Sequence, residues 1–418
     1  MYDWANSAFA VVVLTAFFPF LFKSYWDSGA DAALNTARLG LGDSISGLLV
    51  AFLSPLLGAL ADAGKAKKSF LIFFMALGTL MTFTIWLVGA GAWQTAIAVF
   101  ILANIGFACG NLFYDSLLVD VAPEKDMDSV SSLGYATGYV GGGILYGIDV
   151  LLVLFWQRVG FGSQANAARA GFVLVAVWWM AFSIPLLIFV KEQGTAAGQG
   201  PLSVIVNGLH GLKMTSMKIV RNRLLVLFIV AFWLYMDGVY TVITMAVNFG
   251  LSIGITMKTL LLTVLLVQFV AFPAAIGFGR LARAWGGGTA ILAGIAIYIV
   301  VCASGFFLLR TTVQFVVLAC LVGMVQGGVQ ALSRSYFAKI VPHEDAAEYF
   351  GFLNLISRFS IVVGPVLVGV TTLLSRRMGA GDFLSQRLGM SSITVLFIAG
   401  GILLVLAEKE RTRRIPAA

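Results

Sequence analysis

The chain contains about a dozen runs of roughly twenty apolar residues, spread along nearly its whole length. A helix needs about 20 such residues to cross the hydrocarbon core of a bilayer. Of the 418 residues, 60% are hydrophobic and only 11% are charged, which is unlike a soluble domain. The runs predict an all-α membrane protein of about 12 transmembrane helices, and they exclude a β-barrel, whose strands would be short and alternating. We expect the spans at approximately 2–25, 42–62, 69–91, 93–119, 129–156, 167–190, 223–250, 258–282, 288–309, 312–338, 350–374 and 391–408.

The longest polar connection lies between the sixth and seventh predicted spans. It predicts an N-terminal six-helix bundle at 1–190, a cytoplasmic linker at 191–222 and a C-terminal six-helix bundle at 223–418. Apolar residues in the middle of this linker are spaced as on one helix face, with lysines beside them. An amphipathic helix on the membrane surface and a flexible linker both remain open as interpretations.

Lysine and arginine gather in alternate connections between the spans, and such residues favour the cytoplasmic side. With both termini in the cytoplasm, about 17 of the 27 basic residues face inward. We therefore expect a multi-pass protein of the bacterial inner (plasma) membrane, with the first span retained as a signal anchor. The net charge of +8 then follows from topology and from contact with anionic lipid head groups, so no nucleic-acid partner is needed.

The residues that usually carry metal or catalytic chemistry are few and scattered. Cys109, Cys302 and Cys320 fall inside apolar spans without metal-ligand spacing. Neither His210 nor His343 has a ligand partner at a suitable spacing within a span, and no nucleophile motif or phosphate loop is present. We expect no metal, no cofactor and no enzymatic activity.

Two segments about 219 residues apart resemble each other, at the ends of the fourth and tenth predicted spans. The first runs from Tyr114 to Pro123 and the second from Ser333 to Pro342. Such a repeat predicts two pseudo-symmetric bundles, with opposite charges at matching positions. The matched pairs are Ser116 with Ser335, Asp115 with Arg334, and Asp120 with Lys339.

The second predicted span ends in Gly58-x-Leu60-Ala61-Asp62, and three lysines follow in the next loop. The glycine permits close approach of helices, and the aspartate with its basic neighbours can form a charge latch at a helix end. This segment resembles the loop signature of the major facilitator superfamily. A simple positive-inside loop is the alternative interpretation. We expect a gating loop formed by Gly58, Asp62, Lys65, Lys67 and Lys68.

Three further motifs are more specific. They are Tyr2-Asp3-Trp4-Ala5-Asn6-Ser7-Ala8-Phe9, Tyr235-Met236-Asp237-Gly238-Val239, and the segment from Gln326 to Phe337. Together they resemble the vacuole effluxer-like branch of that superfamily, to which the autophagy-related vacuolar amino-acid exporter belongs. This resemblance covers essentially the whole chain and implies a major facilitator fold, alternating access, and export or exchange of a small solute such as an amino acid. The superfamily default is a monomer.

Asp237 is the foremost candidate for proton coupling, because it lies near the middle of the seventh predicted span. A charge at the bilayer centre costs roughly 2.5 to 3.5 kcal/mol on insertion scales, so such residues persist mainly for a functional reason. The alternative is a structural hydrogen-bond network with Tyr235, Tyr240 or Thr241. Asp149 and Arg358 also fall inside spans, and the sequence assigns them no role.

Polar residues recur along single faces of two predicted helices. On the fourth span Asn104, Asn111 and Asp115 are spaced seven and four apart. Gln326, Gln330 and Arg334 are spaced four apart, and amides can donate and accept while arginine can clamp a carboxylate. In the resembled fold the first, fourth, seventh and tenth helices line the cavity. A pathway that offers both aspartate and arginine suits a zwitterion such as an amino acid. An Asp115 to Arg334 latch is equally compatible. The expected substrate pathway comprises Asp3, Asn6, Asn104, Asn111, Asp115, Asp237, Tyr240, Gln326, Gln330 and Arg334.

Other functions stay open at the level of sequence. A passive facilitator, a carrier of a larger amphiphile such as a lipid or cell-wall fragment, and a non-transporting membrane sensor would share the same hydropathy. The sequence names neither the solute nor the direction of flux nor the coupling ion.

Overall fold

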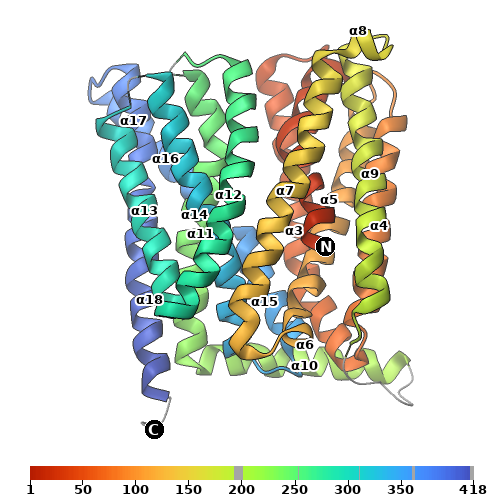
Figure 1. The fold of residues 1–418 in the computed structure, drawn as a ribbon, viewed down its shortest axis with the longest axis vertical. Helices are drawn as coiled ribbons and strands as arrows, with labels where there is room; N and C mark the ends of the chain where they lie inside the picture. The colour runs from red at the N-terminus through yellow and green to blue at the C-terminus, as the bar shows by residue number, and fades with distance from the viewer. Residues whose placement is uncertain (193–200, 253, 310, 360–362, 415–418) are drawn as a thin grey trace. The chain divides into compact units, whose positions relative to one another are not determined.

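The computed structural model describes residues 1–192, 201–252, 254–309, 311–359 and 363–414, and the part of the predicted linker at 193–200 lies outside them. Within these ranges the chain is almost entirely helical (Figure 1). Among the described residues, twelve helical stretches are long and apolar enough to cross a membrane. This confirms the number, the order and the approximate position of the predicted spans.

The first half contains α1 to α9, with a few wider or tighter turns labelled η. The first span is wound partly as π-helix, over η1 and η2. The elements are α1 (Tyr2–Ala8), η1 (Phe9–Phe17), α2 (Phe18–Leu21), η2 (Phe22–Trp26), α3 (Ala32–Gly64), α4 (Lys67–Leu87), α5 (Trp93–Ser116), α6 (Leu118–Val121), η3 (Glu124–Asp126), α7 (Met127–Leu154), α8 (Trp156–Val159) and α9 (Gln164–Phe189).

The second half repeats the pattern after α10, the helix that forms the described end of the predicted linker. The eleventh span is formed by two helices, α15 and α16, and the twelfth by α17 and α18. The elements are α10 (Pro201–Arg221), α11 (Arg223–Ser252), α12 (Met257–Trp285), α13 (Gly287–Phe307), α14 (Thr312–Ile340), α15 (Ala346–Phe359), α16 (Val363–Arg377), α17 (Asp382–Ser392) and α18 (Thr394–Arg414).

Local sequence signals explain where several of these helices begin. The side chains of Asp31, Ser163 and Thr256 each accept a hydrogen bond from a backbone N–H of the helix that follows. Thr311 and Gln314 form a reciprocal capping box at the start of α14. The fifth and eleventh spans begin at Glu124 and Ala346, earlier than expected, because their polar first turns are helical as well.

The described chain divides into two compact units, each formed mostly by one half of the sequence. The first unit comprises Met1–Val121, Thr137–Leu212 and Pro342–Asn354, and the second comprises Ala122–Ala136, Lys213–Val341 and Leu355–Ala418. The start of α7 therefore packs with the second unit, and the start of α15 packs with the first. Each unit thus receives a short polar segment from the other half of the sequence.

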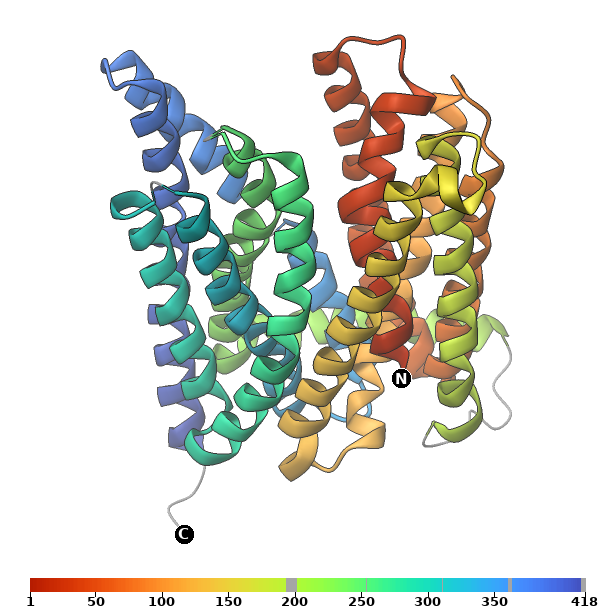
Figure 2. The ribbon, with the colours of Figure 1, turned by 45° about the horizontal axis from the view of Figure 1, so that its top comes forward.

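Within each unit the helices pack side by side (Figures 1 and 2). In the first unit α4 packs against α5 and α9, and Gly78 and Gly106 bring the backbones of α4 and α5 so close that a side chain at Gly106 would overlap α4. In the second unit α12 and α13 pack against α14, and α11 packs against α18.

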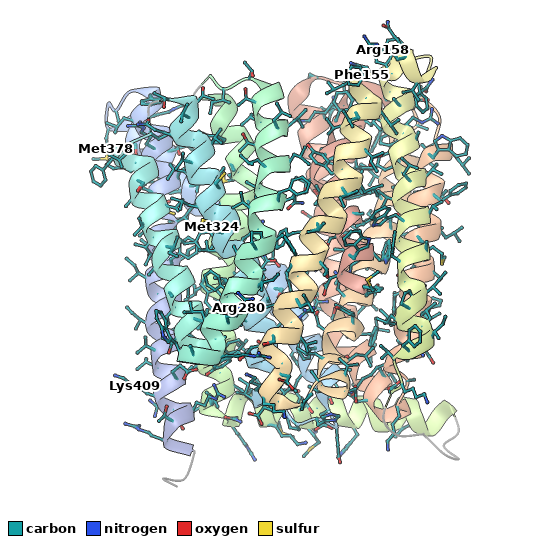
Figure 3. All side chains as sticks on the ribbon, in the orientation of Figure 1. Phe155, Arg158, Arg280, Met324, Met378 and Lys409 are labelled. Atoms are coloured by element: carbon teal, nitrogen blue, oxygen red, sulfur yellow. The ribbon has the colours of Figure 1, made fainter. Side chains whose placement is uncertain are left out.

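Large apolar side chains point outward on both units, as a lipid environment requires. Among those labelled in Figure 3, Met324 and Met378 are 45% and 86% exposed. The polar and charged side chains that the structure buries are therefore the exceptions, and they define the candidate site.

Candidate functional site

The first unit contains a polar cluster between α1 and α5. Tyr114 donates its hydroxyl proton to Asp3 Oδ2, and Asn6 Nδ2 donates to Asn111 Oδ1. Asp3 and Asn6 are buried, while Asn111 and Tyr114 are half-buried. Since residues three or four apart share a face of a helix, two neighbouring turns of α1 meet two neighbouring turns of α5. We call Asp3, Asn6, Asn111 and Tyr114 the first polar cluster.

The other polar residues predicted on α5 lie close to this cluster in sequence. Asp115 follows Tyr114 directly and is half-buried. Asn104 is buried two turns away and donates to Ser46 Oγ of α3 at 2.8 Å. The structure therefore connects Asn111 with α1 and Asn104 with α3. The predicted polar face of α5 thus contacts two different helices.

Asp237 of the second unit holds the first turn of α16. Its carboxylate accepts hydrogen bonds from the backbone N–H groups of Val363 at 3.1 Å and of Gly364 at 2.9 Å. Thr241, one turn along α11, donates to the same carboxylate at 3.3 Å. An anionic side chain at a helix N-terminus is stabilised by the unpaired N–H groups and by the helix dipole. Asp237 is thus a cap for α16.

Gly364 is the residue that makes this cap possible. A Cβ at this position would overlap the Thr241 hydroxyl and lie 2.7 Å from Asp237 Oδ1. The backbone of α16 therefore approaches α11 as closely as only glycine permits. The network around Asp237 includes Thr241, as one of the two predicted alternatives had it.

The remaining predicted residues of the second unit lie on α11 and α14. Tyr235 pairs with Ser333 of α14 at 2.7 Å, and Tyr240 is half-buried. Gln326 is buried and Gln330 is half-buried on successive turns of α14. Together with Asp237 these side chains contribute polar groups to the interior of the second unit.

Arg334, one turn beyond Gln330, binds the start of α7. Its Nε donates to Ser131 Oγ at 2.8 Å, its NH2 group donates to the Ser131 carbonyl at 3.1 Å, and its guanidinium stacks over the Tyr135 ring at 4.7 Å. The side chain is 6% exposed. This arginine therefore fixes α7 within the second unit.

The predicted gating loop binds the first turn of α15 in the first unit. The Asp62 carboxylate accepts hydrogen bonds from the backbone N–H groups of Ala347 at 3.3 Å and Glu348 at 2.7 Å. A Cβ on Gly58, one turn earlier on α3, would overlap the Ala347 carbonyl. The glycine brings the two backbones together, and the aspartate stabilises the N-terminus of α15. We call this contact the first seat.

The lysines of the loop have different positions. Lys67 Nζ lies 3.7 Å from Asp62 and 3.3 Å from Asp120, and this side chain is 6% exposed. Lys68 Nζ donates to the carbonyls of Leu187 and Val190 at the end of α9. Lys65 is exposed at the end of α3, where its φ of 46° forms the left-handed turn. Lys67 and Lys68 therefore do more than add positive charge to the loop: they bind neighbouring helices of the first unit.

A second seat in the other unit holds the first turns of α7. Asp128 accepts hydrogen bonds from Lys339 Nζ at 2.6 Å and from the Ser335 hydroxyl at 2.7 Å, both on α14. A Cβ on Gly279 of α12 would lie 2.8 Å from Ser132 Cβ. A glycine and a buried aspartate thus occur in both seats. In the first seat Asp62 of α3 accepts from the start of α15, whereas in the second Asp128 lies on α7 itself and α14 supplies the lysine.

Sequence reasoning missed several residues of this arrangement, namely Asp128, Ser131 and Glu192. The Glu192 carboxylate accepts hydrogen bonds from the backbone N–H groups of Lys67 and Lys68 at the start of α4, 125 and 124 residues away. Asp128 lies five residues after Pro123, and the acidic residues that follow each repeat-ending proline were a signal for it.

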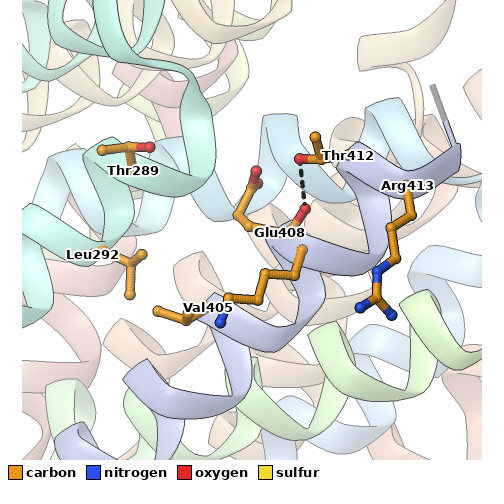
Figure 4. A pocket seen from close by; sticks show the side chains of 7 residues that line it. Thr289, Leu292, Val405, Glu408, Thr412 and Arg413 are labelled. Carbon is orange, nitrogen blue, oxygen red and sulfur yellow. Dashed lines mark hydrogen bonds between the residues drawn. The ribbon is translucent and has the colours of Figure 1, made fainter. Parts of the chain in front are cut away.

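No candidate metal site accompanies these clusters in the described part of the chain. No group of three or more histidine, cysteine, aspartate or glutamate side chains there could hold a metal ion. A shallow pocket of the second unit lies between the start of α13 and the end of α18 (Figure 4). It is lined by Thr289, Leu292, Val405, Glu408, Lys409, Thr412 and Arg413, none of which belongs to the polar clusters.

The twelve spans of the described residues, with their capped helices and buried polar clusters, make this a multi-pass membrane protein, and its fold matches solved structures of the major facilitator type. The human organic anion transporter MFSD10 matches with a TM-score of 0.70 at 14% identity, covering 96% of this chain and 97% of that one. The proton:xylose symporter XylE matches with a TM-score of 0.69 at 11% identity, covering 99% and 94%.

The chain belongs to the vacuole effluxer Atg22-like family, whose model matches residues 1–415. An uncharacterized MFS-type transporter of Bacillus subtilis, YxiO, is 38% identical over 412 residues, or 98% of this chain and 94% of that protein. Autophagy-related protein 22 of Pichia angusta is 25% identical, over 78% of this chain and 68% of that protein. The protein is therefore a membrane transporter and no enzyme.

Proposed function

We propose that this protein exports or exchanges a small polar solute such as an amino acid across the plasma membrane by alternating access, coupled to protons. The buried carboxylate of Asp237, which holds α16 against α11, is the observation that carries the proposal. A carboxylate inside a span is costly and marks ion or substrate pathways. Here it also holds a helix that begins inside a span, and such helix ends often form the ion and substrate sites of transporters.

The chemistry of Asp237 suggests how a proton could act. The ionised carboxylate accepts two backbone hydrogen bonds from α16, and a charge strengthens such bonds roughly twofold. Protonation removes that charge and turns one oxygen into a donor, which the N–H groups of Val363 and Gly364 cannot accept. Proton binding would therefore loosen the first turn of α16. This is the step that we propose for coupling.

The first polar cluster suits the ammonium group of an amino acid. Asp3 supplies a negative charge beside the Tyr114 hydroxyl, and the Asn6 and Asn111 amides supply donors and acceptors one turn away. Asp115 adds a second carboxylate on the same helix. In the second unit Gln326, Gln330 and Tyr240 offer neutral polar groups. We propose that these residues, with Asn104, line the route of the solute.

Arg334 has a different role in this proposal. Its hydrogen bonds to Ser131 and its stacking on Tyr135 hold the start of α7. We therefore assign it to the movement of α7, together with the Asp128 and Lys339 pair. The first seat does the same for α15 through Asp62. Opening of the transporter would require these helix starts to leave their seats.

The test is transport by the purified protein in liposomes. Amino acids that raise its melting temperature in a screen of the common set are loaded on one side, and exchange of the labelled compound is measured. The distribution of basic residues favours a cytoplasmic position for both termini, and we propose this orientation for the protein in cells. Absence of exchange for every common amino acid would overturn the proposed solute class.

A further inference from the structure

Asp149 is the one aspartate of the described residues whose two carboxylate oxygens are both buried without a hydrogen-bond partner. It lies on the part of α7 that belongs to the first unit and is 1% exposed. Neither the polar clusters nor the two seats contain it. One turn earlier on α7, the Tyr146 hydroxyl is also buried without a partner among the described residues. This pair of unused polar groups needs an explanation.

The backbone of α9 forms the wall against which Asp149 packs. An ideal Cβ on Gly171 of α9 would lie 3.2 Å from Asp149 Cγ and 3.3 Å from each carboxylate oxygen. The glycine leaves just enough room for the carboxyl group, and any larger residue would push it aside. The carboxyl group is therefore enclosed by protein rather than directed toward lipid or water.

Arg169 is the basic residue nearest in sequence to Gly171, and it binds residues other than Asp149. Arg169, two residues earlier on α9, donates to the Tyr25 hydroxyl at 2.7 Å and to the Trp86 carbonyl, and it stacks over the Tyr25 ring at 4.7 Å. Residues two apart lie on different faces of a helix. Tyr146 of α7, the other titratable group near this point, offers a hydroxyl group and not a cation. Asp149 consequently has no counter-ion among the described residues.

We propose that Asp149 is a proton-binding site of the first unit, separate from Asp237. An ionised carboxylate without a partner is strongly disfavoured in such surroundings, whereas a carboxylic acid loses only the hydrogen bonds that it would make with water. The ligand that completes the site is a proton, held on one carboxylate oxygen. The inference does not depend on the transported solute, and its tests need no transport.

Infrared spectroscopy of the protein in liposomes tests this directly, because a protonated carboxyl group has its own carbonyl stretch. At neutral pH we expect this band in the wild type and in Asp237→Asn, and its loss in Asp149→Asn. An unchanged band in Asp149→Asn would overturn the proposal. If that variant does not fold, Gly171→Ala gives the answer: its methyl group crowds the carboxyl and should shift the band, and an unshifted band counts against the proposal.

Thermal or denaturant unfolding at several pH values provides a second readout. If the folded chain keeps one proton that the unfolded chain releases, stability falls as pH rises, and the unfolding equilibrium constant grows about tenfold per pH unit. Asp149→Asn should reduce this slope by one proton. An identical slope in the wild type and in the variant would contradict the site, whatever the outcome of the transport assay.

Discussion

The Asp62 carboxylate accepts a hydrogen bond of 2.7 Å from the backbone N–H of Glu348, which lies 286 residues further along the chain. A residue at the end of one helix therefore caps the start of another that comes from the opposite half of the sequence. Because the contact depends on a side-chain charge and on the glycine at position 58, small substitutions can weaken it selectively. Substitutions in this contact, the first seat, therefore test the predicted gating loop.

Replacing Asp62 by alanine should destabilise the folded protein by about 1 kcal/mol, since a lost helix cap typically costs 0.5 to 2 kcal/mol. Asp62→Asn retains an acceptor but loses the charge, so we expect a smaller loss. The melting temperature in detergent measures both, with the exposed Ser69→Ala of α4 as the control. Equal melting temperatures for all three variants would show that the seat does not hold α15.

The buried ion pair of the second seat should show strong coupling between its partners. Asp128 and Lys339 are 7% and 12% exposed and lie 2.6 Å apart, so a double-mutant cycle with alanine should give about 1 to 3 kcal/mol. The exposed pair Asp126 and Arg283, 3.5 Å apart, is the matched control and should give about 0.5 kcal/mol or less. Similar coupling energies in the two cycles would be evidence against the second seat.

Two glycines of α16 provide a matched test of the Asp237 cap. Gly364→Ala should force α16 away from Asp237 and Thr241, with a stability loss of about 1 to 3 kcal/mol and loss of transport. Gly369→Ala, on the same helix with open space around its Cα, should stabilise the helix by about 0.5 to 1 kcal/mol. If both variants transport like the wild type, the close approach of α16 is not required.

The hydrogen bond between Tyr114 and Asp3 should contribute to solute binding. A hydrogen bond to a charged group is worth about 1.5 to 3 kcal/mol, so Tyr114→Phe should weaken binding about tenfold or more. Asp3→Asn should weaken it further, and the double variant should lose less than the sum because both changes affect one cluster. Isothermal calorimetry with the amino acid found in the melting screen measures this. Full affinity in Asp3→Asn would exclude an ammonium-binding role.

The fold was largely predictable because a bilayer imposes both the length and the composition of each span. The twelve spans follow from hydropathy alone. A contact of Asp237 with Thr241, one turn away on the same helix, was among the hydrogen bonds that the sequence offered as an alternative to proton coupling. These are local or compositional properties, which a single sequence carries directly.

The caps were not predictable, because they join residues far apart in the chain. Val363 follows Asp237 by 126 residues, and no local pattern connects them. Ser131, which receives Arg334, lies 203 residues before it. The internal repeat indicated that charges at the ends of the fourth and tenth spans matter, but not their partners: Lys339 and Arg334 bind the start of α7, and Asp120 pairs with Lys67 of α4.

Proton-driven exchange in liposomes tests the central claim most directly. With the common amino acids inside and a labelled mixture outside, an imposed pH gradient should accelerate exchange by the wild type. Asp237→Asn should still exchange solute, at a rate that the gradient leaves unchanged, because the asparagine binds no proton and, like a protonated aspartate, offers a single acceptor oxygen to the first turn of α16. An equal response to the gradient in the wild type and in Asp237→Asn would contradict the account.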